Sequence, residues 1–377
     1  MKTELTSSAE LRHQMTERLA SQGALRSDAW RSAFADVPRE GFVPHQFTVG
    51  AGGHKHSYTP NDPAWLPVVY SDAALLTQFD ASGTATSSST QPWLMAHMLE
   101  DLDVEPGHRV LEVGLGTGYN CALLTHRLGH VNVFSIDIDP DLVTVAAGRL
   151  RDLGYAPTVA VGDGRQGLPA HAPYDRLLAT CGIARVTAAW RAQLRPGGVI
   201  VVNIGLGIAR LVVGEDRSVS GRFRPYLGAF TAARAAPDAV AATARQLTRR
   251  LATARGHRRS VQVTANLASE GPRFLGSLVQ PDVVSFSFTD PDGHQVHCLH
   301  DPATESWARI TLLDVRAARL DHGGPRDLWA EREPLINRWV SHGRPAPGHY
   351  GLTVSPAGDH TLWLDSPSGY SWPLPDA

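Results

Sequence analysis

The chain has 377 residues, of which 42% are hydrophobic, and a formal net charge of −2 at pH 7. This length is enough for two domains with hydrophobic cores, and a charge near zero argues against broad binding to a nucleic acid backbone. Three cysteines (Cys121, Cys181 and Cys298) are too few and too scattered for a disulfide framework. With neither a signal peptide nor an apolar run of membrane-spanning length, the sequence predicts a cytoplasmic globular protein.

Hydrophobic spacing predicts three helices before the first buried strand, at residues 9–22, 27–35 and 92–102. Residues 39–44 read as a bend, and residues 49–67 as a long loop rich in glycine and proline. Residues 84–92 are rich in serine and threonine, which by composition favours a solvated loop. Because they directly precede a helix whose Pro92 suits a first turn, we expect them to lie over the active-site end of the sheet.

The stretch 109–120 organises the rest of the chain. It opens with a short apolar run, Val110–Val113, as a buried parallel strand does. Gly114, Gly116 and Gly118 follow at alternate positions, and an amphipathic helix comes next. Strand, glycine turn and helix make the opening of a doubly wound nucleotide-binding sheet, in which glycines let the backbone approach a ligand closely.

Two acids at the ends of the next strands sharpen this prediction. The apolar run 131–136 ends on Asp137, roughly 20 residues past the glycine loop, where an acid can accept both ribose hydroxyls. The run 158–161 leads to Asp163, which could reach an adenine amino group. No lysine follows the glycines as in a phosphate-binding P-loop. This succession resembles a class I methyltransferase that binds S-adenosylmethionine. The alternative is a doubly wound domain whose glycines only make turns.

The α/β alternation continues to about residue 230. We expect strands at 174–180 and 199–204, a helix at 187–194, and a closing hairpin of 210–214 with 221–229. Beyond it we expect an alanine-rich helix at 237–254, hairpins of 283–288 with 294–300 and of 352–354 with 361–364, and a helix at 328–341. The basic residues at 245–250 and 257–259 read as the solvated face of a helix. The predicted fold class is α/β, with a doubly wound, Rossmann-like class I methyltransferase sheet in residues 1–232 and a C-terminal α+β domain in residues 233–377.

One strand carries a possible metal site. Alternation places His294, Cys298 and His300 on one face of the strand at 294–300, an arrangement that resembles metal ligands. A fourth ligand is lacking at that spacing. We therefore interpret these as surface or half-buried strand residues and expect no metal.

A set of motifs in a fixed order carries a family resemblance. The motifs are Arg39 with Phe42–Pro44, Tyr70–Asp72, Thr90–Pro92, Val110–Tyr119, Gly162–Gly164 and Ala172–Asp175. From about Leu11 to Phe230 the chain resembles the protein-L-isoaspartate O-methyltransferases. It departs from the repair enzymes of that family in two respects. Thr90 stands where they usually carry serine, and a further domain follows residue 230, near which they end.

Both departures resemble a specialised branch that matures ribosomally made peptides alongside ATP-grasp ligases, in graspetide pathways. Residues 87–92 (Ser-Ser-Ser-Thr-Gln-Pro), Tyr70–Asp72, Gly351–Val354 and Trp363–Asp365 fit that branch. The resemblance implies that S-adenosylmethionine methylates a defined aspartate in a modified precursor peptide, leaving S-adenosylhomocysteine. The ester then closes to an aspartimide, whose hydrolysis yields aspartate and isoaspartate. The C-terminal domain in residues 233–377 would recognise the peptide substrate.

The resemblance also implies the site residues. Thr90, with Ser88 and Ser89 as second choices, would hold the substrate carboxylate through its hydroxyl and nearby amides. The alternative role for Thr90, an ordinary helix cap, is compatible with this one. The cofactor would be bound by Glu112, Gly114, Gly116, Thr117, Asn120, Asp137, Ile138, Asp163 and Gly164. Glu112 can instead pair with the loop backbone. Because a carboxylate is already ionised at neutral pH, positioning would matter more than a strong base.

Three rival interpretations remain open. The first is a general isoaspartyl repair enzyme with an accessory domain. The second is a non-catalytic scaffold that binds a peptide or a partner enzyme, although a scaffold needs no ribose-binding acid such as Asp137. The third is a small-molecule methyltransferase, which only the generic sheet supports. In every case we expect no nucleic acid or membrane partner.

Overall fold

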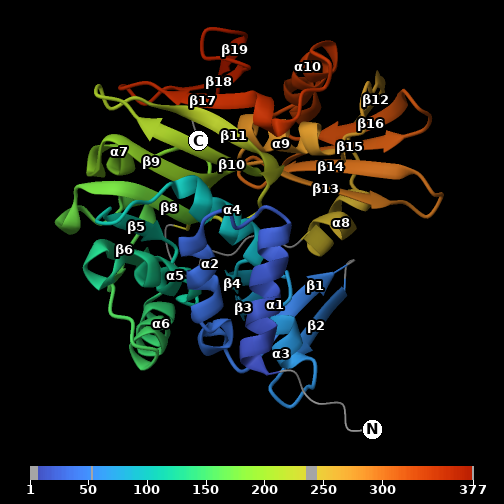
Figure 1. The fold of residues 1–377 in the computed structure, drawn as a ribbon. Helices are drawn as coiled ribbons and strands as arrows, with labels where there is room; N and C mark the ends of the chain where they lie inside the picture. Colours follow the sequence, from blue (N-terminus) through green and yellow to red (C-terminus); the bar gives the residue numbers. More distant parts are fainter. Residues whose placement is uncertain (1–6, 52–53, 235–243, 376–377) are drawn as a thin grey trace.

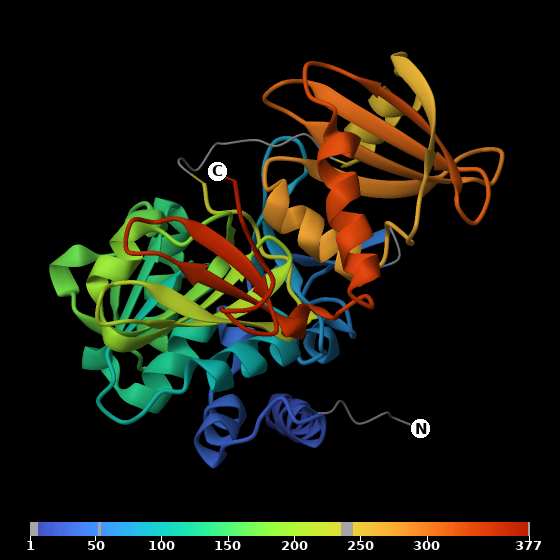
Figure 2. The same ribbon diagram turned by 90° about the horizontal axis from the view of Figure 1, so that it is seen from above.

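The computed structural model describes residues 7–51, 54–234 and 244–375 (Figure 1). Within them the strands form three sheets, of ten, five and four strands. The ten-stranded sheet is the centre of the molecule, and the five-stranded sheet forms a separate layer at its C-terminal side (Figure 2). No helix in these residues has both the length and the apolar character needed to span a bilayer.

The central sheet has the strand order β19-β18-β17-β11-β10-β9-β8-β5-β6-β7. Its parallel strands are β5 (Val110–Val113), β6 (Val133–Asp137), β7 (Thr158–Val161), β8 (Tyr174–Ile183) and β9 (Leu194–Ile204). The helices before and between them are α4 (Pro92–Leu102), α5 (Tyr119–Leu128), α6 (Pro140–Asp152) and α7 (Ala188–Gln193). Every residue of β5 is buried, because both faces of the sheet are covered. Val110 packs into one hydrophobic core and Leu111 into the other, so the predicted doubly wound sheet is confirmed.

Five antiparallel strands extend this sheet. They are β10 (Gly207–Val213), β11 (Val219–Leu227), β17 (Tyr350–Val354), β18 (His360–Leu364) and β19 (Ser371–Pro373). β17 pairs with β11, and the hydroxyls of Ser220 and Thr353 are hydrogen-bonded at 2.8 Å. By their hydrogen bonding, β17 to β19 belong to the sheet of the N-terminal 232 residues. The predicted domain boundary at residue 232 therefore does not separate one sheet from the other, because β17 to β19 belong to the central sheet.

The remaining C-terminal residues form a five-stranded antiparallel sheet with three helices. The strands are β12 (His257–Gln262), β13 (Val284–Thr289), β14 (Gln295–Asp301), β15 (Ser306–Leu312) and β16 (Ala317–Gly323), in the order β12-β16-β15-β14-β13. The helices are α8 (Ala244–Ala252), α9 (Glu270–Val279) and α10 (Leu328–Ser341). α9 and α10 lie between this sheet and the central sheet (Figure 2). The predicted additional α+β region is confirmed.

The structure bears on the predicted basic helix face and on the predicted helix at 237–254 in this region. The basic run at 257–259 lies on strand β12 and not on a helix face, because Arg258 pairs across the sheet with the buried Asp321. Residues 237–243 of the predicted helix 237–254 lie outside the described residues. The prediction of surface or half-buried residues at 294, 298 and 300 was wrong for Cys298 and His300, which are 0% and 2% exposed. Cys298 packs with Leu251 in an apolar cluster on β14.

The N-terminal region is more ordered than its composition suggests. It contains α1 (Ser8–Ser21), α2 (Asp28–Asp36), the 3-10 turn η1 (Arg39–Phe42), α3 (Trp65–Val69), β1 (Phe47–Ala51), β2 (His54–Tyr58), β3 (Leu75–Phe79) and β4 (Ala85–Ser89). Further 3-10 turns along the chain are η2 (His130–Asn132), η3 (Gly164–Gln166), η4 (Pro169–His171) and η5 (Pro347–His349). The strands pair in the order β2-β1-β3-β4, so the prediction of a loop was wrong for the parts of 49–67 and 84–92 that lie in β1, β2, α3 and β4. Strand pairing by backbone hydrogen bonds accepts serine and threonine, whereas the prediction rested on composition. The expected position of 84–92 over the active-site end of the sheet is confirmed, because residues 86–90 line the pocket there.

Candidate active site

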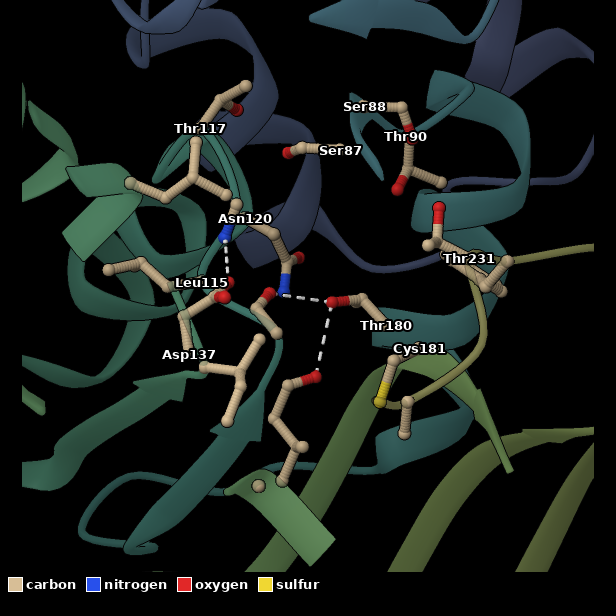
Figure 3. Close-up of a pocket in the computed structure, with 18 of the residues that line it drawn as sticks. Ser87, Ser88, Thr90, Leu115, Thr117, Asn120, Asp137, Thr180, Cys181 and Thr231 are labelled. Carbon is tan, nitrogen blue, oxygen red and sulfur yellow. Dashed lines mark hydrogen bonds between the residues drawn. The ribbon is translucent and has the colours of Figure 1, made fainter. Parts of the chain in front are cut away.

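A pocket opens at the carboxyl ends of the parallel strands, where β4 faces the loop after β5 (Figure 3). It contains about 930 Å³ of space, part of it open to solvent. The predicted site residues that line it are Ser88, Ser89, Thr90, Gly114, Gly116, Thr117, Asn120, Asp137, Ile138, Asp163 and Gly164.

Two glycines shape the loop after β5. Gly114 and Gly116 have φ values of +99° and +50°, a region that side chains disfavour. A Cβ on Gly114 would come within 2.8 Å of the Thr180 hydroxyl. That hydroxyl donates to the Gly114 carbonyl at 2.7 Å and so fixes the loop against the end of β8. The backbone is therefore open to close approach by a ligand, which fits the predicted cofactor.

Asp137 and Asp163 lie at the ends of β6 and β7, as predicted. Asp137 accepts a hydrogen bond from the Gly116 amide at 2.9 Å, and burial raises the pKa of its carboxyl above the ordinary value. Asp163 is held by Arg165, whose guanidinium hydrogen bonds keep the pKa of that carboxyl low. Two oriented acids beside a glycine loop fit the ribose and adenine ends of an adenosyl group.

Glu112 has a different place from the other predicted cofactor residues. It is fully buried in β5 and lies outside the lining of the pocket. Its carboxylate accepts hydrogen bonds from the Asn120 side chain and the Ser135 hydroxyl, both at 2.5 Å. Burial raises the pKa of Glu112 to about 7. Glu112 therefore holds Asn120, which does line the pocket.

The opposite side of the pocket is rich in hydroxyl groups (Figure 3). In β4 and just after it, Ser88 and Thr90 stay partly exposed, whereas Ser89 is buried. The Ser89 hydroxyl accepts a hydrogen bond from Arg39 at 3.3 Å. Thr231 lies on the same side as Thr90, from a segment distant in sequence (Figure 3). Thr90 and Ser88 are therefore better placed than Ser89 to contact a substrate.

Thr90 does not cap the helix that follows it. α4 begins at Pro92 with Gln91 as its N-cap, and no side chain of the cap residue bonds to the helix. Asp72 takes this role instead, accepting hydrogen bonds from the Trp93 amide at 2.8 Å and the Gln91 side chain at 3.0 Å. The cap interpretation of Thr90 was wrong, and its hydroxyl is not used to begin the helix.

The sequence prediction missed one wall of the pocket. Residues 230–234 line it, together with Thr180 and Cys181 at the end of β8. The segment is fixed by hydrogen bonds between Gly182 and both Thr231 (2.9 Å) and Ala233 (2.8 Å). The polar Thr180 at the end of a buried strand was a usable signal, because ligands bind at carboxyl ends of strands. Residues 230–234 gave none, since they follow the last predicted strand and have no motif.

A second missed residue, Gln78 of β3, links the two sides of the site. Its amide donates to Asp139 at 2.8 Å and its carbonyl accepts from the Thr86 hydroxyl at 2.7 Å. Asp139 follows Asp137 closely, and its amide donates to the Asp137 carboxylate at 3.2 Å. The hydroxyl-rich hairpin is thus tied to the loop that carries the predicted ribose-binding acid.

The doubly wound sheet, the glycine loop and the acid at the end of β6 define a class I methyltransferase. The family model described as Protein-L-isoaspartate(D-aspartate) O-methyltransferase (PCMT) matches residues 10–223. The chain belongs to this family of carboxyl O-methyltransferases, which depend on S-adenosylmethionine.

Relatives and a solved structure agree with this assignment. The protein-L-isoaspartate O-methyltransferase of Hyperthermus butylicus is 34% identical over 208 residues, covering 52% of this chain and 76% of that protein. That of Methanopyrus kandleri is 35% identical over 197 residues, again covering 52% and 76%. A solved protein-L-isoaspartate O-methyltransferase structure shares the fold with a TM-score of 0.55 at 24% identity, covering 94% of this chain and 100% of that one. The likeness in fold therefore extends well past residue 232.

Proposed function

We propose that this methyltransferase esterifies the side-chain carboxylate of an aspartate in a ribosomally made, modified peptide. The observation that carries the proposal is one pocket with two chemically different sides. One side has the glycine loop and Asp137, and the other has the partly exposed residues Ser88 and Thr90. Hydroxyl and amide donors suit a carboxylate, which is acceptor-only when ionised.

The chain's own residues supply position and charge. Bound S-adenosylmethionine provides an electrophilic methyl group on a sulfonium. Thr90 and Ser88 orient a carboxylate oxygen, and the ionised carboxylate needs no base to deprotonate it. Thr231 and its neighbours form the pocket wall on the same side as Thr90. Alignment of a preformed nucleophile is enough for a large part of the rate gain.

The product's chemistry explains why such a step would be useful. In a methyl ester of aspartate, the next backbone amide nitrogen attacks the ester carbonyl. Methoxide leaves and takes up the amide proton, so methanol is released as the five-membered aspartimide forms. Hydrolysis of that ring gives aspartate or isoaspartate. A cytoplasmic setting beside an ATP-grasp ligase that cyclises the same peptide belongs to this proposal.

A second candidate is the general repair of isoaspartyl residues. It is favoured by the solved structure, because its fold matches 94% of this chain. The C-terminal region therefore does not by itself distinguish this chain from other proteins named protein-L-isoaspartate O-methyltransferase. What supports the dedicated substrate is the threonine at position 90 and the serine-rich strand before it.

Mass spectrometry with two substrates separates the candidates. The pure protein is incubated with S-adenosylmethionine and either a generic isoaspartyl hexapeptide or the macrocyclised precursor peptide encoded beside its gene. S-adenosylhomocysteine in place of the methyl donor is the control. Gain of one methyl group and then loss of methanol on the precursor alone supports the proposal. Turnover of the hexapeptide with the precursor untouched assigns the enzyme to general repair.

A further inference from the structure

A buried arginine lies directly behind the hydroxyl-rich side of the pocket. Arg39, in the turn η1, is 0% exposed. Its guanidinium donates six hydrogen bonds, to the carbonyls of Val69 (2.7 Å), Ser71 (3.3 Å), Ala73 (3.1 Å), Ser89 (3.3 Å) and Thr90 (2.9 Å) and to the Ser89 hydroxyl (3.3 Å). One side chain thus joins the segment 69–73 to the residues that face the substrate.

All six acceptors are formally neutral, although the donor carries a charge. Burial lowers the pKa of Arg39 to about 10, so the guanidinium is still protonated at neutral pH. Asp72 stabilises this charge from a distance, but its oxygens bond to Trp93 and Gln91. Taking an unpaired charge out of water is costly. A neutral amide side chain has only two N–H donors and could not serve six acceptors, so Arg39 joins the loops and also leaves a positive charge behind the pocket.

The direction of the peptide groups explains where this charge acts. In a trans peptide the carbonyl and the amide N–H point in opposite directions. Arg39 binds the carbonyls of Ser89 and Thr90, so the N–H groups of Thr90 and Gln91 point away from the guanidinium. A donor bound to a carbonyl polarises that peptide and strengthens its N–H as a donor. Ser89 and Thr90 both line the pocket.

We propose that Arg39 is a positioning residue that makes the Thr90 side of the pocket selective for a negatively charged substrate group. It acts through the peptide groups of Ser89 and Thr90, fixing them in place and adding a buried positive charge behind them. The inference rests on the proposed function, since it assumes that the substrate presents a carboxylate here. The inference adds that the positive charge complementary to this carboxylate is buried behind the lining of the pocket and is not exposed on its surface.

The test measures charge preference, which a purely structural role would not change. Isothermal titration gives the Kd of an aspartyl peptide and of its asparagine counterpart, with S-adenosylhomocysteine present. The ratio of the two values is compared in wild type, Arg39→Gln and Arg39→Lys. We expect the preference for the carboxylate peptide to fall at least about tenfold in Arg39→Gln, and to be largely kept in Arg39→Lys, which retains the charge.

Arg149 offers a matched control. It donates one hydrogen bond to the carbonyl of Phe42 at 2.7 Å, in the same turn as Arg39, and lies outside the pocket. Arg149→Gln should leave the ratio unchanged. If Arg39→Gln weakens both peptides equally, so that the ratio stays at its wild-type value, Arg39 is only a structural staple and the inference is overturned.

Salt dependence of the wild-type protein covers the case in which Arg39→Gln does not fold. A buried charge is screened little, whereas a partly exposed one such as Arg234 at the pocket wall is screened more strongly. The ratio of the Kd values of the aspartyl and asparagine peptides should change by less than about twofold between about 0.05 M and 0.5 M salt. A steep fall would place the selective charge on the surface and overturn the inference. If wild type binds neither peptide, the proposed function itself has failed, which is a different result.

Discussion

Replacing Thr90 by valine tests the substrate side of the site with little change in shape. Valine has the size and branching of threonine but no hydroxyl, and both suit the extended backbone near β4. The Thr90 carbonyl keeps its 2.9 Å hydrogen bond from Arg39 in the variant, because that bond involves the main chain. The hydroxyl does not cap α4, so its loss should not disturb that helix. The effect on turnover can therefore be attributed to the missing donor.

The size of the effect follows from the kind of bond that is lost. A hydrogen bond from a neutral donor to a charged acceptor contributes about 1.5–3 kcal/mol when it is shielded from water. Thr90 is only partly buried, so the lower half of this range applies. At about 1.4 kcal/mol per tenfold change, we expect kcat/KM for the peptide to fall by about ten- to fortyfold.

The assay follows methyl ester formation by mass spectrometry over a range of peptide concentrations. Thr90→Ser, which restores the hydroxyl, should recover most of the wild-type kcat/KM. The Kd of S-adenosylhomocysteine should be equal in all three proteins, because the cofactor residues lie on the other side of the pocket. A Thr90→Val enzyme as active as wild type would refute the assignment of Thr90 to the substrate carboxylate.

Three further predictions follow from the same contacts. The pKa of Glu112 is about 7 in the folded protein against an ordinary value of 4.5, so its contribution to stability is present below pH 4.5 and is lost as pH rises through 7. The free energy of unfolding should therefore fall by about 3 kcal/mol across this range. Urea unfolding at pH 5 and at pH 8 should show this fall in wild type and not in Glu112→Gln. Gln78→Ala breaks the link to Asp139 and should raise the peptide KM about three- to tenfold with unchanged circular dichroism. Leu352 lies in β17 and is 0% exposed, so Leu352→Ala should lower the free energy of unfolding by about 2–5 kcal/mol. A change below about 1 kcal/mol would show that β17 is dispensable to the sheet.

The cofactor side of the site could be predicted because it depends on local signals. Positive φ at Gly114 and Gly116 requires glycine, and the acid at Asp137 follows directly from the end of a buried strand. Each of these features involves a few consecutive residues and one known geometry. The doubly wound sheet shares this property, since helices and apolar strands alternate along the chain.

The substrate side could not be predicted to the same depth, because it is assembled from distant segments. Arg39 meets Thr90 across 51 residues, and no spacing rule connects a 3-10 turn to a serine-rich strand. The same holds for Gln78 and Asp139, which are 61 residues apart. Composition was also misleading here, since a run of serines and threonines that favours a loop pairs with β3 as a strand. The motifs indicated that these residues matter, but not what they contact.

A short series of hydrogen bonds connects the C-terminal region to the pocket wall, in addition to the apolar packing of α9 and α10 against the central sheet. The Ser277 hydroxyl of α9 accepts a hydrogen bond from the Leu206 amide at 2.9 Å, and the Leu206 carbonyl accepts from the Gly228 amide at 2.9 Å. The Asn203 side chain then bonds to the Gly228 carbonyl at 3.0 Å and to the Phe230 amide at 3.3 Å. Phe230 begins the pocket wall. A helix outside the family motifs thus sets the position of that wall, and because the strands β17 to β19 return to the central sheet, the region is held from both ends. These hydrogen bonds therefore connect α9 to the pocket wall, although no residue of α9 lines the pocket.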